Sequence, residues 1–180
     1  MKKTILLIAL TIMTGYVFAQ KKTTTAAVVS FDATTEKDAL PKAENKTGIA
    51  SIDTKTGDVA FEAAVKNFSF SNPRIQEHFN GANWLNSDQY PKFSYTGTID
   101  KVDKIKFTKN GTYTVKVKGN LTVKDVTKPL DVEAVFTVTD GKVKATTNFT
   151  IALADYNISG QPIEAGKIAR EPKITVSAEF

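Results

Sequence analysis

The 180-residue sequence has no cysteine, one histidine and one tryptophan. Without cysteine no disulfide can form, so core packing and strand hydrogen bonds must hold the fold together. A metal site of cysteine and histidine ligands cannot be built in one chain whose only such side chain is His78. The 24 Lys and Arg and 19 Asp and Glu residues are scattered, whereas nucleic-acid binding requires a concentrated basic patch. We therefore expect neither a metal nor a nucleic-acid partner.

Apolar runs long enough to cross a membrane are also missing. The longest, residues 4–18, has about fifteen residues and includes threonines and a glycine, and a helical span needs about 20. It follows Lys2-Lys3 and ends in Val17-Phe18-Ala19, which is typical of a secretory signal peptide rather than a membrane anchor. We predict cleavage after residue 19, a mature chain from Gln20 without an integral span, and a periplasmic or secreted bacterial protein.

Most of the remaining chain alternates apolar and polar residues with a period of two, the pattern of half-buried strands. Residues 20–25 are expected to be a flexible start, and the polar residues 33–47 a solvated loop or in part a helical turn. Asn110-Gly111 and Asp140-Gly141 are hairpin signals. Strands are predicted at residues 26–32, 49–53, 58–66, 92–99, 105–107, 113–123, 130–138, 143–153 and 174–180. About eight antiparallel strands form either a barrel or a sandwich.

Residues 70–92 follow neither strand nor long-helix spacing. Asn72 is a helix cap followed by Pro73, and Gly81 is placed to end a short helix. A second helical turn is expected at residues 83–88, before Tyr90-Pro91. A connection this long is usually a lid or binding loop, although it can also be a plug that only caps the core.

The order His78-Phe79, Trp84-Leu85, Tyr90-Pro91, an alternating strand, Gly119-x-Leu121 and then Val126-Thr127-Lys128-Pro129 resembles the YceI-like family over about residues 53–180. The resemblance implies an all-β, lipocalin-like barrel of eight antiparallel strands, with short helical turns between two of them, in a domain of residues 26–180. It also implies an exported protein that sequesters or carries an isoprenoid or other long-chain apolar lipid, such as an isoprenoid quinone or polyprenol. No other cofactor is implied, and a homodimer is left open.

The candidate binding residues fall into two groups. The first occupies the inward phase of its strands and is either a packed core or the wall of a channel, which the resemblance favours: Phe93, Tyr95, Val117, Leu121, Phe136 and Phe149. The second belongs to residues 70–92. There Phe79, Trp84 and Leu85 are expected to close one end of the interior, with His78 or Asn83 meeting the polar end of the ligand.

Two other functions are compatible with the sequence. One is a ligand-free structural or interaction barrel, for example in a stress response, that presents residues 33–47 to a partner. The other is an enzyme acting on a small amphiphile, with His78 as its base. We expect no catalysis, because no paired carboxylates and no phosphate-binding glycine loop accompany the single histidine.

Overall fold

Alternating side chains build the protein almost entirely from strands. The computed structural model describes residues 20–180, and its elements follow in chain order. They are β1 (Lys21–Asp32), β2 (Lys42–Asp53), β3 (Asp58–Ala64), η1 (Val65–Asn67), β4 (Ser69–Phe70), α2 (Pro73–Asn80), β5 (Lys92–Ile99), η2 (Val102–Lys104), β6 (Gly111–Val123), β7 (Val126–Pro129), β8 (Val132–Thr139), β9 (Lys142–Thr150), η3 (Leu153–Tyr156), α3 (Gln161–Glu164) and β10 (Lys173–Glu179).

Eight of these strands close into an antiparallel barrel. The hydrogen-bonded order is β1-β10-β9-β8-β6-β5-β3-β2, and β2 pairs back with β1. Chain neighbours are therefore spatial neighbours throughout, and no edge remains in the ring. The two short strands lie outside it, with β4 on β2 and β7 on β6. The predicted eight-stranded barrel is confirmed, and the sandwich is not formed.

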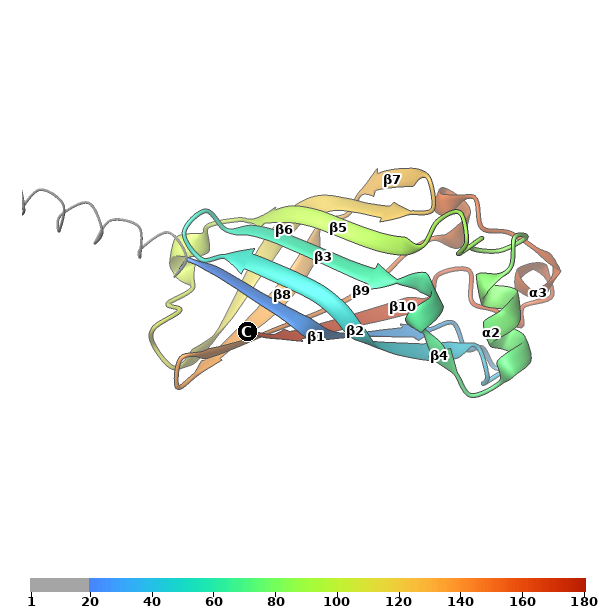
Figure 1. Cartoon of the computed structure of the whole chain (residues 1–180), viewed down its shortest axis with the longest axis horizontal. Coiled ribbons are helices and arrows are strands. Elements are labelled where there is room, and N and C mark those ends of the chain that lie inside the picture. The colour runs from blue at the N-terminus through green and yellow to red at the C-terminus, as the bar shows by residue number, and fades with distance from the viewer. Residues whose placement is uncertain (1–19) are drawn as a thin grey trace, which may run out of the picture.

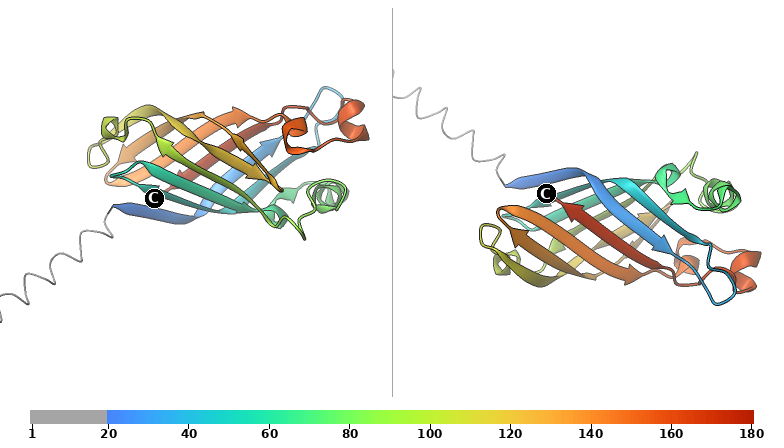
Figure 2. Two further views of the ribbon diagram at one scale, coloured as in Figure 1. Left: turned by 90° about the horizontal axis from the view of Figure 1, so that it is seen from above. Right: turned by 90° about the horizontal axis from the view of Figure 1, so that it is seen from below.

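The connections divide the barrel into two unlike ends (Figure 1). Residues 33–41, 65–91, 124–131 and 151–172 lie at one end, which we call the mouth end. Residues 54–57, 100–110 and 140–141 lie at the other, the base end. Figure 2 shows the strands crossing the barrel obliquely, with α2 and α3 both beyond the mouth end. No helix in residues 20–180 has the length and apolar character of a membrane span.

Local sequence explains the elements that frame these ends. Asp140 and Gly141 have φ values of 50° and 80°, which a two-residue hairpin of type I′ requires, so β8 returns directly as β9. The side chain of Asn72 accepts a hydrogen bond from the Arg74 amide, and Pro73 occupies the first turn, as predicted for the start of α2. The helix ends before Gly81, whose amide donates to the His78 carbonyl.

The interior contains two main apolar clusters, one towards each end. The mouth cluster includes Phe68, Phe79 and Leu85, and the base cluster includes Ile52, Val138 and Val143. At the base end the segment after η2 folds inward: Ile105 is buried, and the Phe107 ring meets Phe136 edge-on at 6.4 Å between centroids. This packing closes the base.

Three sequence expectations need correction. Residues 21–25, predicted to be flexible, begin β1 because they pair with residues 50–53 of β2. Residues 42–47, predicted to be loop, begin β2, whose inward positions there are Ala43 and the hydrogen-bonded Asn45 rather than large apolar side chains. The predicted strand at residues 105–107 is wrong, because these residues plug the base instead of pairing.

Candidate functional site

The barrel encloses an apolar cavity of about 180 Å³. Every one of the eight barrel strands contributes side chains to its wall, mostly valine, isoleucine, alanine and phenylalanine. An eight-stranded barrel is wide enough either to be filled by side chains or to hold one small ligand. For comparison, an apolar cavity of about 150 Å³ in another protein stays dry and takes up benzene. The cavity can therefore accommodate hydrocarbon, and its wall offers almost no partner for a polar group.

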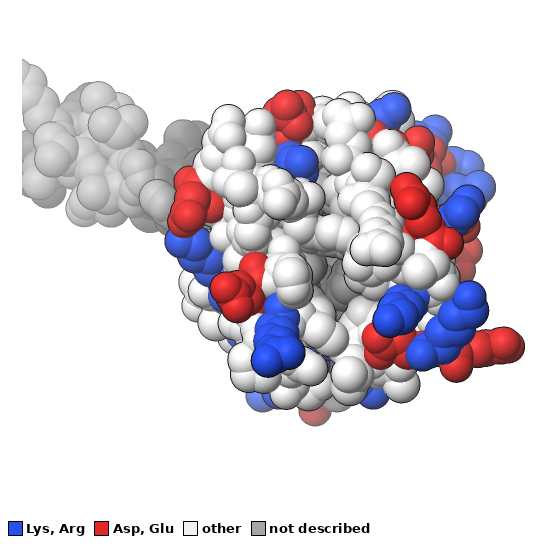
Figure 3. All heavy atoms as spheres, turned by 90° about the vertical axis from the view of Figure 1, so that its right-hand side faces the viewer, with Lys and Arg blue, Asp and Glu red and all other residues white. Residues whose placement is uncertain are grey.

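The cavity runs from the base cluster, where Ile52 and Phe136 line it, to the mouth end. Figure 3 looks onto this end and shows a hollow among uncharged atoms, with the charged groups placed around it. Phe79, Trp84 and Leu85 line the cavity from the β3–β5 connection, and Leu153 and Ile158 line it from the β9–β10 connection. Two long connections therefore form the mouth from opposite strands of the barrel.

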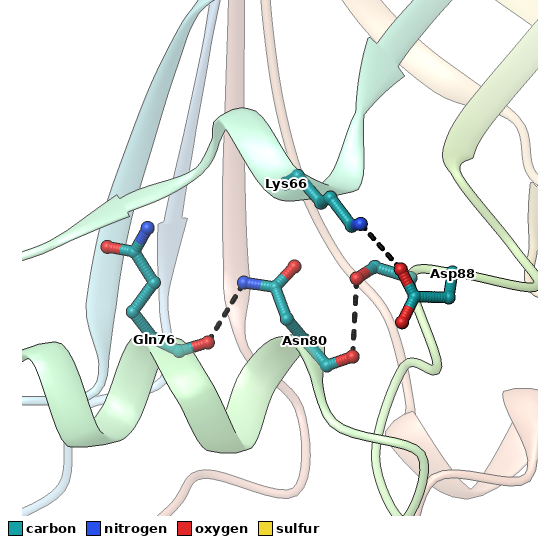
Figure 4. Close-up of polar contacts among 5 residues, drawn as sticks. Lys66, Gln76, Asn80 and Asp88 are labelled. Carbon is teal, nitrogen blue, oxygen red and sulfur yellow. Dashed lines mark hydrogen bonds and ion pairs between the residues drawn. The ribbon is translucent and has the colours of Figure 1, made fainter.

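The β3–β5 connection is held in shape by its own hydrogen bonds. The carbonyl of Phe79 accepts from the Leu85 amide, and the carbonyl of Asn80 accepts from both the amide and the hydroxyl of Ser87. Figure 4 shows the last of these, together with the ion pair that joins Lys66 of η1 to Asp88 at 2.5 Å. The ion pair is exposed and contributes little stability, so the buried backbone contacts define the turn.

Aromatic packing fixes the inner side of the same connection. The Phe79 ring lies 4.9 Å from Phe70, 5.7 Å from Phe68 and 5.8 Å from Phe31, all between ring centroids. Aromatic pairs in such tilted and edge-on arrangements add about 0.5–1.5 kcal/mol each beyond area burial. Phe79 therefore anchors α2 onto β1, β4 and Phe68, the residue that follows η1. It is 6% exposed, so it belongs to the core as well as to the cavity wall.

Trp84 is half-buried and reaches across the mouth. A methyl group placed on Gly160 would lie 3.8 Å from the Trp84 ring, so the ring lies beside the β9–β10 connection. Gly160 has a φ of 151°, which other residues rarely adopt, so the backbone conformation favours glycine here. Trp84 thus joins the two sides of the mouth.

Tyr95 places a hydroxyl group in the cavity wall, at about the middle of β5. Its hydroxyl donates to the carbonyl of Leu130 at 3.1 Å, at the point where the chain leaves β7 for β8. The ring lies against the paired residues Gly97 and Gly119, where an added Cβ would meet the hydroxyl at 3.0 and 2.5 Å. Burial, and to a lesser extent the charge of Asp131, raise the pKa of Tyr95 to about 12. Tyr95 is therefore a neutral hydrogen-bond donor at any physiological pH.

The structure places nine of the eleven predicted site residues on the cavity wall. These are Phe79, Trp84, Leu85, Phe93, Tyr95, Val117, Leu121, Phe136 and Phe149. His78 and Asn83 are exposed and are not part of the wall. On a helix, successive residues point about 100° apart, so α2 turns His78 outward when it buries Phe79.

Sequence reasoning did not select several other wall residues. Phe31, Phe61 and Ile174 lie in the inward phase of β1, β3 and β10, so strand alternation was a sufficient signal for them. Leu153 and Ile158 lie in the β9–β10 connection, where no periodic pattern marks them. The Leu153 amide donates to the Arg170 carbonyl at 3.0 Å, and the Ile158 amide donates to the Leu153 carbonyl at 3.1 Å, so backbone bonds within the connection hold both residues.

The fold and cavity define a closed eight-stranded barrel with an apolar interior open at one end, and comparisons with known proteins agree. A family model described as the YceI-like domain matches residues 13–180. The chain therefore belongs to the YceI-like family. A search of curated proteins finds no match.

Three solved structures are similar to this chain. Burkholderia cenocepacia BcnA has a TM-score of 0.72 at 16% identity, covering 86% of this chain and 96% of that one. A polyisoprenoid binding domain from Saccharophagus degradans, implicated in plant cell wall breakdown, has a TM-score of 0.75 at 12% identity, covering 89% and 97%. The YCEI protein of Campylobacter jejuni has a TM-score of 0.55 at 18% identity, covering 74% and 80%. At sequence identities this low, the structural similarity establishes a common fold and nothing more.

Proposed function

We propose that this protein binds one long-chain apolar lipid, most simply an isoprenoid, inside the barrel, and that it sequesters or carries this lipid without chemical change. The observation that supports the proposal most is the cavity wall, which is hydrocarbon from nearly all sides and is drawn from all eight barrel strands. The family and the polyisoprenoid binding domain of similar fold point to a binding protein rather than an enzyme.

The wall also sets how the ligand lies. Lys, Arg, Asp and Glu contribute nothing to it, and the Tyr95 hydroxyl already donates its proton to Leu130. A charged or strongly polar group placed there would lose its hydration without replacement. The apolar chain therefore enters, and the polar end stays at the mouth. His78 and Asn83 remain candidates for contacting that end only if the β3–β5 connection moves, because both side chains are exposed.

Burial of hydrocarbon is sufficient to drive this binding. About 400 Å² of ligand surface removed from water corresponds to roughly 10 kcal/mol. Ordering of the ligand and loss of its free motion consume a large part of that gain. What remains is compatible with micromolar or tighter affinity. The mechanism is solvent exclusion.

Native mass spectrometry and Trp84 fluorescence test the proposal. Protein purified without detergent should carry an apolar mass, and titration with a polyprenol should change the emission of Trp84, the one tryptophan, saturably. Trp84→Ala should weaken binding measured by calorimetry, whereas Tyr113→Ala, a ring removed outside the cavity, should not. Absence of both a bound mass and a saturable change would refute lipid binding and favour the ligand-free barrel.

We further propose that the protein acts after export, in the periplasm or outside the cell. This proposal rests on the sequence pattern of residues 1–19, which lie outside the residues that the structure describes. N-terminal sequencing of the exported protein should return Gln20 as the first residue. Recovery of Met1 on the exported form would contradict the predicted cleavage.

A further inference from the structure

Two large apolar side chains are exposed to solvent within residues 20–180. Leu40 is 46% exposed and Ile49 is 49% exposed. Ile49 faces outward from the middle of the β2 wall, where it is opposite Glu62 of β3. Leu40 lies instead at the mouth end, in the connection between β1 and β2. The two residues are therefore matched in character and exposure but differ in their place on the barrel.

The backbone holds Leu40 in its outward position. The Leu40 amide donates to the Asp38 carboxylate at 2.8 Å, and its carbonyl accepts from the Lys42 amide at 2.7 Å. Thr35 and Asp38 pair with each other as an isolated bridge. An exposed leucine on an ordered turn is already arranged for contact, so burying it in a partner requires little further ordering.

The Leu40 connection is also joined to the rest of the mouth. The Lys37 ammonium donates to the Ala165 carbonyl at 3.0 Å, and the Thr35 hydroxyl donates to the Gly166 carbonyl at 2.9 Å. The Ala169 amide donates to the Ala33 carbonyl at 2.9 Å. Leu40 therefore belongs to the same surface as the β9–β10 connection that lines the cavity opening.

The charge of this surface argues against an anionic partner. The four mouth connections together contain seven Lys and Arg and nine Asp and Glu, whereas the three base connections contain five and three. Figure 3 shows uncharged atoms around the hollow and both signs of charge towards its margin. A mixed rim around an apolar centre fits a surface that is uncharged overall, and Trp84 at the mouth suits the interface between lipid headgroups and acyl chains.

We propose that the mouth end docks on a zwitterionic lipid bilayer, with Leu40 inserted among the headgroups and the cavity opening facing the lipid. The inference rests on the proposed function. A lipid that passes directly from the bilayer into the cavity never exposes its chain to water, which would cost about 0.8 kcal/mol per methylene group. Docking by the base end would leave the opening facing solvent.

Flotation with phosphatidylcholine vesicles tests the docking face. The mature protein should float with the vesicles, Leu40→Glu should reduce the bound fraction by about tenfold, and Ile49→Glu should leave it unchanged, because a charge at an inserted site opposes partition. Raising the salt concentration should not release the protein, since apolar contact is not screened. Trp84 emission should shift to shorter wavelength on binding these isoprenoid-free vesicles.

Binding of farnesol in solution separates this proposal from the function it rests on. Both variants should bind farnesol as the unchanged protein does, because neither residue lines the cavity. Equal flotation of both variants, or salt-sensitive binding that requires phosphatidylglycerol, would overturn docking through Leu40. Farnesol binding without any flotation would overturn docking and leave the lipid-binding function standing. Flotation without farnesol binding would support the docking face and refute the cavity as the lipid site.

Discussion

The paired glycines beside Tyr95 determine how wide the barrel can be at mid-depth, and replacing one of them tests this. Gly97 of β5 lies directly opposite Gly119 of β6, and the Tyr95 ring rests on the pair. In Gly119→Ala the new Cβ would stand 2.4 Å from the Thr96 carbonyl oxygen and 2.5 Å from the Tyr95 hydroxyl. Both distances are too short for non-bonded atoms, so the β5 backbone at Thr96 and the Tyr95 ring must both move.

The size of the effect follows from these distances. Ordinary contact is near 3.5 Å, so β5 and β6 must separate locally by roughly 1 Å, and the Tyr95 ring must turn into the cavity. Overpacking of this kind costs about 1–3 kcal/mol, and contact with a backbone atom that cannot rotate away places Gly119→Ala at the upper end. The displaced ring also loses its hydrogen bond to Leu130, which contributes about 1 kcal/mol.

Urea unfolding and farnesol binding measure the two consequences. Gly111→Ala is the matched control in the same strand, because the three atoms nearest its Cβ would belong to the Tyr113 side chain, with 3.0 Å to the hydroxyl. Adding Tyr95→Leu to Gly119→Ala should restore part of the lost stability, since the Thr96 contact remains. Full restoration would show that the backbone contact is harmless. No restoration, or unchanged farnesol affinity in Gly119→Ala, would refute the idea that the ring is forced into the cavity.

Three further predictions concern stability measured by urea unfolding. Leu121→Lys should lower the free energy of unfolding by at least about 3 kcal/mol and abolish farnesol binding, because it puts a charge on the buried wall. The control Asn120→Lys, at the neighbouring outward position, should change the stability very little. Equal stabilities of the two variants would mean that the inward and outward positions of β6 are wrongly assigned. Because the pKa of Tyr95 is raised to about 12, the folded state keeps a proton that the unfolded chain loses near pH 10. The free energy of unfolding should therefore fall from pH 10 to 12, and its excess over that of Tyr95→Phe should shrink in this range. A constant excess would contradict the raised pKa of Tyr95. Asn45→Ala should lower the free energy of unfolding by about 2–4 kcal/mol, because it leaves the Ala64 carbonyl and the Thr47 amide without their partner. The control Asn67→Ala, at an exposed position, should cost less than about 1 kcal/mol. An equally small cost for Asn45→Ala would show that solvent reaches the two backbone groups.

Strand alternation was enough to predict the barrel wherever large apolar residues occupy the inward phase. In β6 the order Tyr113, Val115, Val117 is unambiguous, and the strand was predicted almost to its ends. The first half of β2 shows where strand alternation is not a sufficient signal. Its inward positions are Ala43 and Asn45, and Asn45 is fully buried because it bonds to Ala64 of β3, which no local pattern can reveal.

The site was predictable to a similar extent. The inward phase placed six side chains on the cavity wall, and the cap and proline of α2 located Phe79. The expected contacts of His78 and Asn83 rest on polarity alone, and helical geometry points His78 away from Phe79. Trp84 and Gly160 lie beside each other although they are 76 residues apart in sequence, so only the folded barrel brings them together.

The asymmetry of the barrel explains how one small domain can be both stable and open. In an up-and-down barrel, successive connections alternate between the ends, so the four mouth connections fall together regardless of what they do. Because the base is plugged by Ile105 and by the Phe107–Phe136 contact, its cluster can provide stability without the ligand. In the mouth cluster, Phe79 and Leu85 line the cavity and also anchor the connection around it. Substitutions at base residues outside the cavity wall, such as Val138 or Val143, should therefore change stability and leave affinity nearly intact, whereas substitutions at Phe79 cannot separate the two.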